Sequence, residues 1–254
     1  MSAVSAELLQ TIKELQSLPS LTHAILGGGT NLAIRFSHRQ SIDIDFFFSG
    51  IIGKAGFLEI EKQVKDYYKD RIFGLSYPCD ESDQFTFMRF FVRINGGNAI
   101  KVELMQNANF VDVIEELEGV RMASICDIGL LKLMAVANRA SQKDVYDLDY
   151  ITELVPLAEL MDLLKSKREK FCSDQHKTIF DLDGEISPIE NPLLLLKFEE
   201  TALVSQSRPG HAEHRVVPMK TQKNWQVARS SYRSKIRKYF GQKGIDFPSI
   251  APLN

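Results

Sequence analysis

The stretch from His23 to Phe48 reads HAILGGGTNLAIRFSHRQSIDIDFFF and decides the fold of the chain. It opens with a short apolar run that predicts a strand, and this run ends in three glycines. Glycine lets the backbone turn tightly and approach a ligand, because it has no Cβ atom. We expect a helix to begin at Thr30, and the N–H groups at the start of that helix favour a bound phosphate.

Two aspartates follow the predicted helix with one residue between them. Asp43 and Asp45 alternate with apolar residues in Ile42–Phe46, and in a strand this alternation places both carboxylates on one face and the apolar side chains, Ile42 included, in the core. Two neighbouring carboxylates repel each other unless a cation lies between them, and hard oxygen ligands suit Mg²⁺. The alternatives are a solvated polar strand face and, for the glycines alone, a simple turn; the two features together favour a site.

This combination resembles the nucleotidyltransferase superfamily, whose signature is Gly-Gly or Gly-Ser followed about a dozen residues later by Asp-x-Asp. Within that superfamily the stretch looks like the branch of the AbiEii/AbiGii toxins, in which an Arg precedes a Ser-x-Asp-x-Asp segment. Arg39 and Ser41 match that pattern, whereas Gly27 replaces a lysine that is usual in the branch, and this departure bears on how the nucleotide is held. The matching signature residues are Gly28, Gly29, Thr30, Asp43 and Asp45.

Composition sets the broad class of the chain. It has 254 residues, of which 44% are hydrophobic and 25% charged, enough for one large or two modest globular domains. Met1–Leu18 predicts an amphipathic helix without the basic start of a signal peptide, and no run approaches the roughly 20 apolar residues of a membrane span. Three cysteines, odd in number and widely spaced, indicate reduced, buried thiols in a cytoplasmic setting.

Charge is distributed unevenly along the chain. The net charge is −2, but His214–Ile245 has nine Lys and Arg residues and no Asp or Glu, so the remainder carries −11. Such segregation indicates an electrostatic partner, and a basic face on a helix over 225–240 suits a phosphate backbone. The alternative is a solubilising helix face that docks on the acidic part of the chain. The candidate RNA contacts are Lys223, Arg229, Arg233, Arg237 and Lys238.

A hairpin in the middle of the chain supplies a third carboxylate. Phe85–Ile94 and Ala99–Met105 are predicted strands, and the Asn-Gly turn between them is a strong hairpin signal. In the second strand Lys101 and Glu103 point to one face. The resemblance implies a third metal-binding carboxylate on such a strand, and Glu103 is the residue available, although a solvated strand glutamate is the alternative.

A second block of resemblance covers two helices after the hairpin. The segment 123–139 is apolar nearly all round, so its lysine, Lys132, must pair, reach solvent or face a cleft. The resemblance implies that this lysine binds nucleotide phosphate and that an aspartate of the next helix takes part in activity. Asp144 is one candidate, although Ser141-x-x-Asp144 also looks like a helix cap, and Asp147 is another. The residues that fill the pattern are Asp127, Lys132, Arg139, Lys143, Asp144 and Asp147.

Together these features predict an α/β (α+β) nucleotidyltransferase fold with a mixed sheet over residues 1–120 and a mostly helical domain over 121–254. The predicted reaction moves a nucleoside monophosphate from an NTP to an acceptor hydroxyl, with two Mg²⁺ ions on Asp43, Asp45 and Glu103. Gly28, Gly29 and Thr30 would cradle phosphate, while Lys132 and Arg39 would neutralise charge.

The resemblance further implies a toxin of a type IV toxin–antitoxin or abortive-infection system, with an antitoxin partner. Some relatives add nucleotides to the tRNA acceptor end, and the basic tail agrees with an RNA acceptor. The alternatives are an aminoglycoside-modifying type of nucleotidyltransferase, which would use a sugar hydroxyl, and a non-catalytic module that binds nucleotides or a partner.

Overall fold

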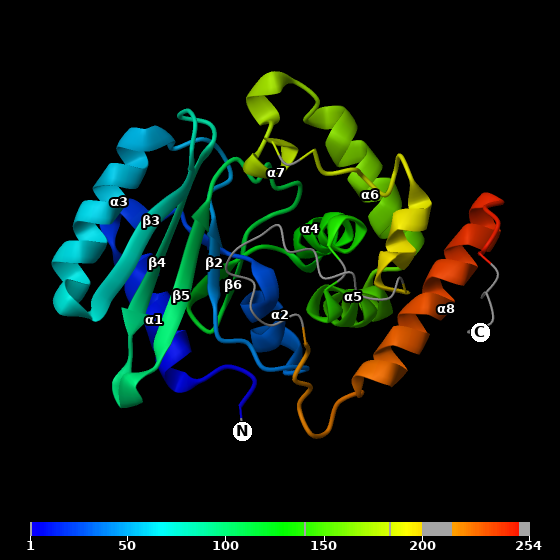
Figure 1. Cartoon of the computed structure of the whole chain (residues 1–254), viewed down its shortest axis with the longest axis horizontal. Coiled ribbons are helices and arrows are strands. Elements are labelled where there is room, and N and C mark those ends of the chain that lie inside the picture. The colour runs from blue at the N-terminus through cyan, green and yellow to red at the C-terminus, as the bar shows by residue number, and fades with distance from the viewer. Residues whose placement is uncertain (1, 140, 183, 200–214, 249–254) are drawn as a thin grey trace. The chain divides into compact units, whose positions relative to one another are not determined.

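The computed structural model describes residues 2–139, 141–182, 184–199 and 215–248 (Figure 1). The chain forms two compact units. Unit 1 comprises Met1–Ile128, Ser166–Glu185 and Val217–Gln222, and unit 2 comprises Gly129–Lys165, Ile186–Val216 and Lys223–Asn254. The division into residues 1–120 and 121–254 stays a prediction.

Unit 1 is built on a mixed sheet, as the sequence predicts. In the described part of the chain this sheet has seven strands in the order β3-β4-β5-β2-β1-β7-β6. β2 pairs with β5, and β1 with β7, in parallel, while the other neighbours are antiparallel. The strands are β1 (Ile25–Leu26), β2 (Ile44–Phe47), β3 (Ile72–Asp80), β4 (Thr86–Arg93), β5 (Ala99–Met105), β6 (Glu115–Leu117) and β7 (Val120–Met122).

The predicted hairpin is confirmed by the antiparallel pairing of β4 with β5, in which Phe90 lies opposite Val102. Alternation then separates the two faces of the central strands. Ile44, Phe46 and Val102 are fully buried on one face. The residues between them point to the other face, which is where the charged side chains lie.

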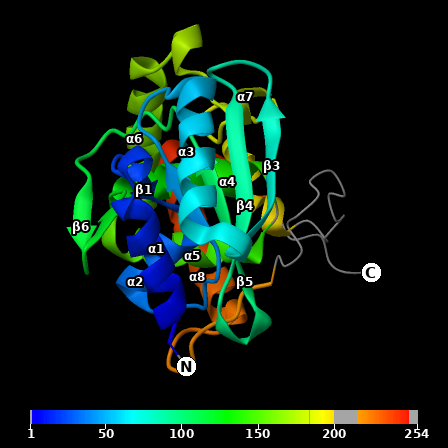
Figure 2. The ribbon, with the colours of Figure 1, turned by 90° about the vertical axis from the view of Figure 1, so that its left-hand side faces the viewer.

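Two helices cover the apolar face of the sheet. α1 (Ala6–Ser17) and α3 (Gly53–Tyr68) lie side by side on it (Figure 2). Leu8, Ile12 and Phe57 pack in one hydrophobic core with the apolar residues of β2, β4 and β5. The amphipathic N-terminal helix predicted from the sequence is therefore confirmed, and the helices leave the opposite face of β2 and β5 for polar groups.

The stretch between β1 and β2 differs in two details from the expectation. The helix α2 (Gly28–Phe36) begins within the glycines rather than at Thr30. The expectation for Ile42 was wrong: the side chain is 65% exposed. The strand begins only at Ile44, where its pairing with β5 begins, so Asp43 lies immediately before β2.

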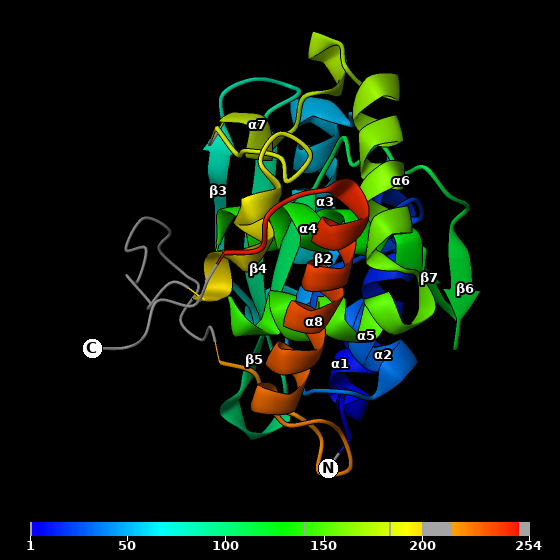
Figure 3. The same ribbon diagram turned by 90° about the vertical axis from the view of Figure 1, so that its right-hand side faces the viewer.

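Unit 2 is helical, and Figure 3 shows α8 beside α5. The buried helix predicted over 123–139 is confirmed as α4, with the boundary between the units inside it, and the tail helix is confirmed as α8. No helix in the described ranges is both long and apolar enough to cross a bilayer.

The remaining helices of the two units are α4 (Ile125–Asn138), α5 (Gln142–Leu154), α6 (Leu157–Lys170), α7 (Ile179–Leu182) and α8 (Trp225–Lys243). Short 3-10 segments cover Pro19–Leu21, Lys69–Arg71, Asn95–Gly97, Asp174–His176 and Pro192–Glu199.

A buried carboxylate on α5 holds the basic helix. Asp149 is fully buried, and its two oxygens accept hydrogen bonds of 2.7 Å from the ammonium groups of Lys223 and Lys235. In addition to these two ion pairs, the side chains of Tyr232 and Ile236 of α8 are fully buried. The alternative that the basic helix docks on an acidic part of the chain is thus correct for part of the basic segment, because two of its lysines form ion pairs with Asp149 within unit 2.

We predict that Asp149→Ala lowers the free energy of unfolding by about 3 kcal/mol, because two half-buried lysines lose a fully buried carboxylate. Urea unfolding followed by the fluorescence of Trp225, the single tryptophan at the start of α8, measures this loss. The control is Asp162→Ala, because that carboxylate is 68% exposed and pairs with Lys243 at 3.3 Å; its cost should stay below about 0.5 kcal/mol. Equal losses in the free energy of unfolding for the two variants would contradict the stabilising role of Asp149.

Candidate functional site

The polar face of β2 and β5 brings the three predicted carboxylates to neighbouring positions. Asp45 lies opposite Glu103 in the parallel register, so both side chains leave the same face of the sheet. Asp43 comes two residues before Asp45, and its side chain is 39% exposed. Glu103 is buried. Asp45 and Glu103 therefore share one face of the sheet, and Asp43, just outside the strand, is half-buried like Asp45.

Both oxygens of Glu103 are held by basic side chains. Arg89 of β4 lies opposite Glu103 and donates to Oε1 from Nη2 at 2.6 Å and from Nε at 2.8 Å. Lys101 Nζ donates to Oε2 at 2.9 Å. Burial alone would raise the pKa of Glu103, but these two cations outweigh it and lower that pKa. Glu103 is thus an ionised carboxylate with its own cations.

Lys101 also approaches a second carboxylate. Its Nζ lies 3.8 Å from Oδ2 of Asp43, and its side chain is 14% exposed. Burial would lower the pKa of this lysine, but Glu103, Asp43 and Asp45 together raise it above its usual value. The ammonium therefore stays charged between the acidic groups. The sequence places Lys101 on the face of Glu103, but it does not show that Lys101 reaches Asp43.

The glycines at the start of α2 leave space for two candidate functional side chains, those of Asp45 and Arg39. Gly28 has a φ of +59°, and a Cβ there would collide with Oδ2 of Asp45. A Cβ on Gly29 would collide with Nη2 of Arg39. The Arg39 side chain is buried, and its Nη1 donates to the carbonyl of Gln40 at 3.0 Å. Glycine is therefore required at both positions, because the carboxylate and the guanidinium lie directly against the first turn of the helix.

Thr30 fixes the loop that carries Asp43. Its hydroxyl donates to the backbone carbonyl of Asp43 and lies 2.8 Å from the hydroxyl of Ser41. Thr30 is buried. The first-turn N–H groups of a helix have no acceptor within the helix, so the backbone of α2, rather than the threonine hydroxyl, offers donors for phosphate.

The chemistry of the site fits a divalent cation on part of the predicted ligand set. Asp43 and Asp45 provide hard carboxylate oxygens, and the position of the Lys101 ammonium shows that this face attracts a cation. Within the described ranges, however, no group of three or more His, Cys, Asp or Glu side chains is arranged to hold a metal ion. Glu103 faces Arg89 and Lys101 instead.

The predicted residues of unit 2 form a cluster of their own. Lys132 Nζ lies 2.7 Å from Oδ1 of Asp144 and 2.7 Å from Oδ2 of Asp147, and all three side chains are buried. Arg139 Nε donates to the other oxygen of Asp144 at 2.7 Å. Burial would raise the pKa of Asp144, but Arg139 and Lys132 hold it well below its usual range. The cluster thus matches two basic side chains with two carboxylates.

The helix-cap arrangement considered for Asp144 is not formed. Ser141 occupies the N-cap position of α5, but its side chain makes no capping hydrogen bond. The backbone N–H of Ser141 donates to the carbonyl of Arg139 at 2.9 Å, so it is not capped by the carboxylate of Asp144.

Asp127, the first residue of the second block of resemblance, has a structural role. Its carboxylate accepts hydrogen bonds from the backbone N–H groups of Val111 and Asp112.

The candidate RNA contacts differ in what they touch. Lys223 pairs with Asp149 and Glu153 inside unit 2. Arg233 and Arg237 lie over the ring of Phe247, at 5.1 and 4.7 Å from its centroid. Arg229 and Arg233 are half-buried, whereas Arg237 and Lys238 are exposed. The two exposed side chains are therefore the ones best placed to meet a ligand.

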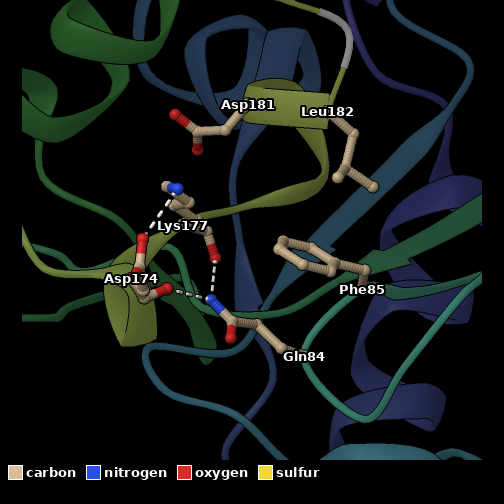
Figure 4. A pocket seen from close by; sticks show the side chains of 6 residues that line it. All are labelled: Gln84, Phe85, Asp174, Lys177, Asp181 and Leu182. Atoms are coloured by element: carbon tan, nitrogen blue, oxygen red, sulfur yellow. Dashed lines mark hydrogen bonds and ion pairs between the residues drawn. The ribbon is translucent and has the colours of Figure 1, made fainter.

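A hollow of about 440 Å³ is present in unit 1 (Figure 4). Gln84 donates to the carbonyls of Asp174 and Lys177 at 2.7 and 2.8 Å, and Lys177 pairs with Asp174. Exposed ion pairs of this kind contribute little to stability. None of the predicted site residues lines the hollow, which is formed by Gln84, Phe85, Asp174, Lys177, Asp181 and Leu182.

The glycine turn, the two aspartates and the second block of charged residues all lie within a segment that one family model matches. That model, described as nucleotidyl transferase AbiEii toxin of a type IV toxin–antitoxin system, covers residues 13–242. The chain belongs to the AbiEii toxin family. The family predicted from the sequence is thereby confirmed, and membership carries nucleotidyltransferase activity, a nucleotide substrate and an antitoxin partner.

The individual relatives share 27% or less of their aligned residues with this AbiEii protein. An uncharacterised protein of Aquifex aeolicus (strain VF5) is 27% identical over 169 residues, which cover 66% of the chain and 77% of the relative. Among solved structures, MenT4, a nucleotidyltransferase toxin from Mycobacterium tuberculosis H37Rv, superposes with a TM-score of 0.54 at 15% identity. The match covers 90% of the chain and 82% of MenT4. At this identity the likeness concerns the fold, and it confirms the predicted fold class.

We predict that Gly28→Ala lowers the free energy of unfolding by about 2 to 4 kcal/mol, because a positive φ and a collision with Asp45 act together. Urea unfolding followed by circular dichroism measures the change. Gly97→Ala is the matched control, since Gly97 also has a positive φ of +80° but nothing within 4 Å of an added Cβ. That control should lose only about 1 kcal/mol, and equal losses would show that the contact with Asp45 is unimportant.

Proposed function

We propose that this AbiEii protein transfers a nucleoside monophosphate from an NTP to a hydroxyl at the end of an RNA, with tRNA as the acceptor class. The acceptor oxygen bonds to the α-phosphorus, the bond from that phosphorus to the bridging oxygen of the β-phosphate breaks, and pyrophosphate and the hydroxyl proton leave. The observation that carries the proposal is the placement of the Asp45 carboxylate against the first turn of α2, with Asp43 held to the same turn through its backbone carbonyl by Thr30.

Asp43 and Asp45 are the proposed ligands of a divalent cation, with Mg²⁺ the ion that suits such oxygens. When bound, Mg²⁺ supplies positive charge that stabilises the attacking and leaving oxygens. Asp45 is held against Gly28, so its carboxylate is positioned in advance, and Thr30 fixes the backbone of Asp43 through its carbonyl. The sequence predicts a second Mg²⁺ ion, with Glu103 as a further ligand. Whether Glu103 binds that ion depends on its contacts with Arg89 and Lys101.

The start of α2 is the proposed phosphate cradle. The N–H groups of its first turn, at Gly28, Gly29 and Thr30, have no acceptor within the helix, and such helix starts favour anions. Arg39 lies against Gly29 and adds a fixed positive charge. Together they can balance part of the charge of a triphosphate, and positioning and charge stabilisation are the main requirements of phosphoryl transfer.

Lys132, Asp144 and Asp147 are proposed participants in nucleotide binding and activity on the basis of the resemblance. The ammonium of Lys132 is already balanced by two carboxylates at 2.7 Å. A phosphate that contacts this lysine therefore competes with Asp144 and Asp147. We propose that Arg139 keeps Asp144 ionised when Lys132 changes partner.

The RNA acceptor is proposed from the exposed part of the basic helix. Arg237 and Lys238 point to solvent on α8, whereas Lys223 and Lys235 are used by Asp149. A basic helix face can track a phosphate backbone without reading its sequence. A cytoplasmic location, where RNA and antitoxin are available, is part of this proposal.

We predict that Asp43→Asn reduces transfer of labelled nucleotide to total RNA by at least about 100-fold, because one of the two proposed carboxylate ligands of the divalent cation is lost. The variant should keep its circular dichroism spectrum, since Asp43 is partly exposed. Asp66→Asn, a change on the exposed side of α3, should leave transfer unaffected.

Three outcomes of this assay oppose parts of the proposal. Undiminished transfer by Asp43→Asn would rule out the metal site. Labelling of aminoglycosides instead of RNA would favour the small-molecule alternative. Thermal stabilisation by NTP without any turnover would favour a non-catalytic module.

We further predict that Arg237→Glu/Lys238→Glu weakens RNA binding and makes the slope of log K against log salt shallower by about 1.4, or about 0.7 for each lost phosphate contact. Fluorescence anisotropy with labelled tRNA over a salt series measures the slope. The matched charge reversal Lys62→Glu/Lys170→Glu changes two exposed lysines of unit 1 and controls for net charge. If both double variants give the same slope, the face of α8 does not bind RNA.

A further inference from the structure

Aromatic side chains of β3 and β4 lie on the face of the sheet that also carries the candidate site. Along β4, Phe87, Arg89 and Phe91 alternate with buried residues, so their side chains share this face. Phe73 of β3 lies directly opposite Phe91 in the antiparallel register. α1 and α3 cover the other face (Figure 2), and the core beneath them includes none of these rings. We call Phe73, Phe87 and Phe91 the aromatic face.

Two rings of the aromatic face form a stacked pair at the edge of the sheet. The centroids of Phe73 and Phe91 are 5.4 Å apart, and the angle between the ring planes is 24°. Phe73 is 37% exposed, and Phe91 is half-buried. In the described part of the chain β3 is an edge strand, so no further strand lies beyond Phe73. Accessible aromatic rings on a sheet are a surface on which nucleobases stack.

Two arginines border the stacked pair. The guanidinium of Arg93 lies 4.6 Å from the centroid of Phe73 and donates to the backbone carbonyl of Asp70 at 2.8 Å. Arg71 donates to the carbonyl of Arg93 at 3.1 Å. Both arginines are exposed, and neither forms an ion pair with a residue that the structure describes. Backbone carbonyls do not neutralise a guanidinium, so both charges are available to phosphate groups.

The aromatic face is continuous with the candidate site. The guanidinium of Arg89 lies 5.4 Å from the centroid of Phe87 and also binds Glu103 through two nitrogens. Phe91 lies opposite Lys101, whose ammonium is 3.8 Å from Asp43. In the sheet β4 lies two strands from β2 (Figure 1), or about 10 Å at the usual strand spacing. One bound RNA end can therefore contact both the rings and the proposed metal ligands.

The extent of the aromatic face favours a single strand over a free nucleotide. Phe87 and Phe91 are four residues apart in β4, which is about 13 Å at the rise of a strand. One nucleobase cannot cover both rings, whereas successive bases of a strand can. Duplex RNA keeps its bases paired and presents phosphates and ribose hydroxyls to a protein, so it leaves no base for stacking on a ring.

We propose that the aromatic face binds the single-stranded end of the RNA acceptor. Its unpaired bases stack on the rings, and its phosphates contact Arg71 and Arg93. This inference rests on the proposed function and specifies the form of the acceptor. Stacking tolerates any base, because every base has a π-face, so the aromatic face selects unpaired RNA rather than a particular sequence.

Binding of a labelled oligouridylate of about ten nucleotides, measured by fluorescence anisotropy in EDTA, tests the proposal without any nucleotide transfer. Phe73→Leu keeps an apolar side chain but loses the ring, and we expect it to weaken binding at least about 5-fold. The slope of log K against log salt should stay unchanged in this variant, because stacking releases no counterions. Arg93→Gln should make that slope shallower by about 0.7, the value for one lost phosphate contact with a single strand.

Tyr67→Leu is the matched control for the loss of a ring. Tyr67 is 49% exposed and pairs with Tyr68, but it belongs to α3, on the other side of the sheet. Its substitution should leave binding of the oligouridylate unchanged. Equal losses in Phe73→Leu and Tyr67→Leu, or no loss in Phe73→Leu and Arg93→Gln, would overturn the proposal.

Two further ligands test the assignment to a single strand. A duplex RNA of the same length should bind the wild type more weakly than the oligouridylate, and its binding should not respond to Phe73→Leu. Binding of ATP should not respond either. A loss of duplex or ATP binding in Phe73→Leu as large as the loss of oligouridylate binding would overturn the assignment.

Photocrosslinking of the wild type makes the test independent of how the variants fold. Ultraviolet irradiation with the same oligouridylate, followed by mass spectrometry of the peptides, should find crosslinks in β3 and β4. Crosslinks confined to other segments, α8 included, would overturn the proposal.

The transfer assay separates this inference from the proposed function. If Asp43→Asn abolishes transfer but no ring variant changes binding, the aromatic face is overturned and the proposed function stands. If the wild type binds the oligouridylate through Phe73 but transfers no nucleotide to any RNA, the proposed function is overturned, and with it the role of the bound strand as an acceptor.

Discussion

The parallel pairing of β2 with β5 is the constraint on which unit 1 depends. It places Asp45 beside Glu103 and brings Lys101 within reach of Asp43. The same pairing sends Ile44 and Phe46 to the opposite face, into a core covered by α1 and α3. One register therefore sets both the hydrophobic layer and the charged layer, and a shift by one residue would exchange the two.

Much of this arrangement follows from local patterns in the sequence. The alternation in β2 and β5 and the Asn-Gly turn predict the strands, the hairpin and the face that carries the carboxylates. The role of Arg89 was missed, although counting back from the hairpin turn places it opposite Glu103. The exposure of Ile42 was not predictable in this way, because it depends on where pairing with β5 begins. Pattern alone sets the faces of a strand, but its neighbour sets its ends.

Ion pairs between distant segments account for most of what the sequence could not predict in unit 2. Asp149 and Lys235 are 86 residues apart, and no local pattern connects them. A stretch rich in lysine and arginine therefore looks more available to a ligand in sequence than it is in the folded chain. The predicted pairing requirement of Lys132 was sound, but the identity of its partners, Asp144 and Asp147, depended on how α4 and α5 pack.

The contact between Gly28 and Asp45 has an evolutionary consequence. The carboxylate fills the space that any larger residue at position 28 would need, so the turn and the aspartate are sterically interlocked. Neither half can drift independently: a side chain at 28 would displace the acid, and a bulkier acid at 45 would displace the turn. The two motifs, seventeen residues apart in the chain, should therefore be inherited, or lost, as one unit.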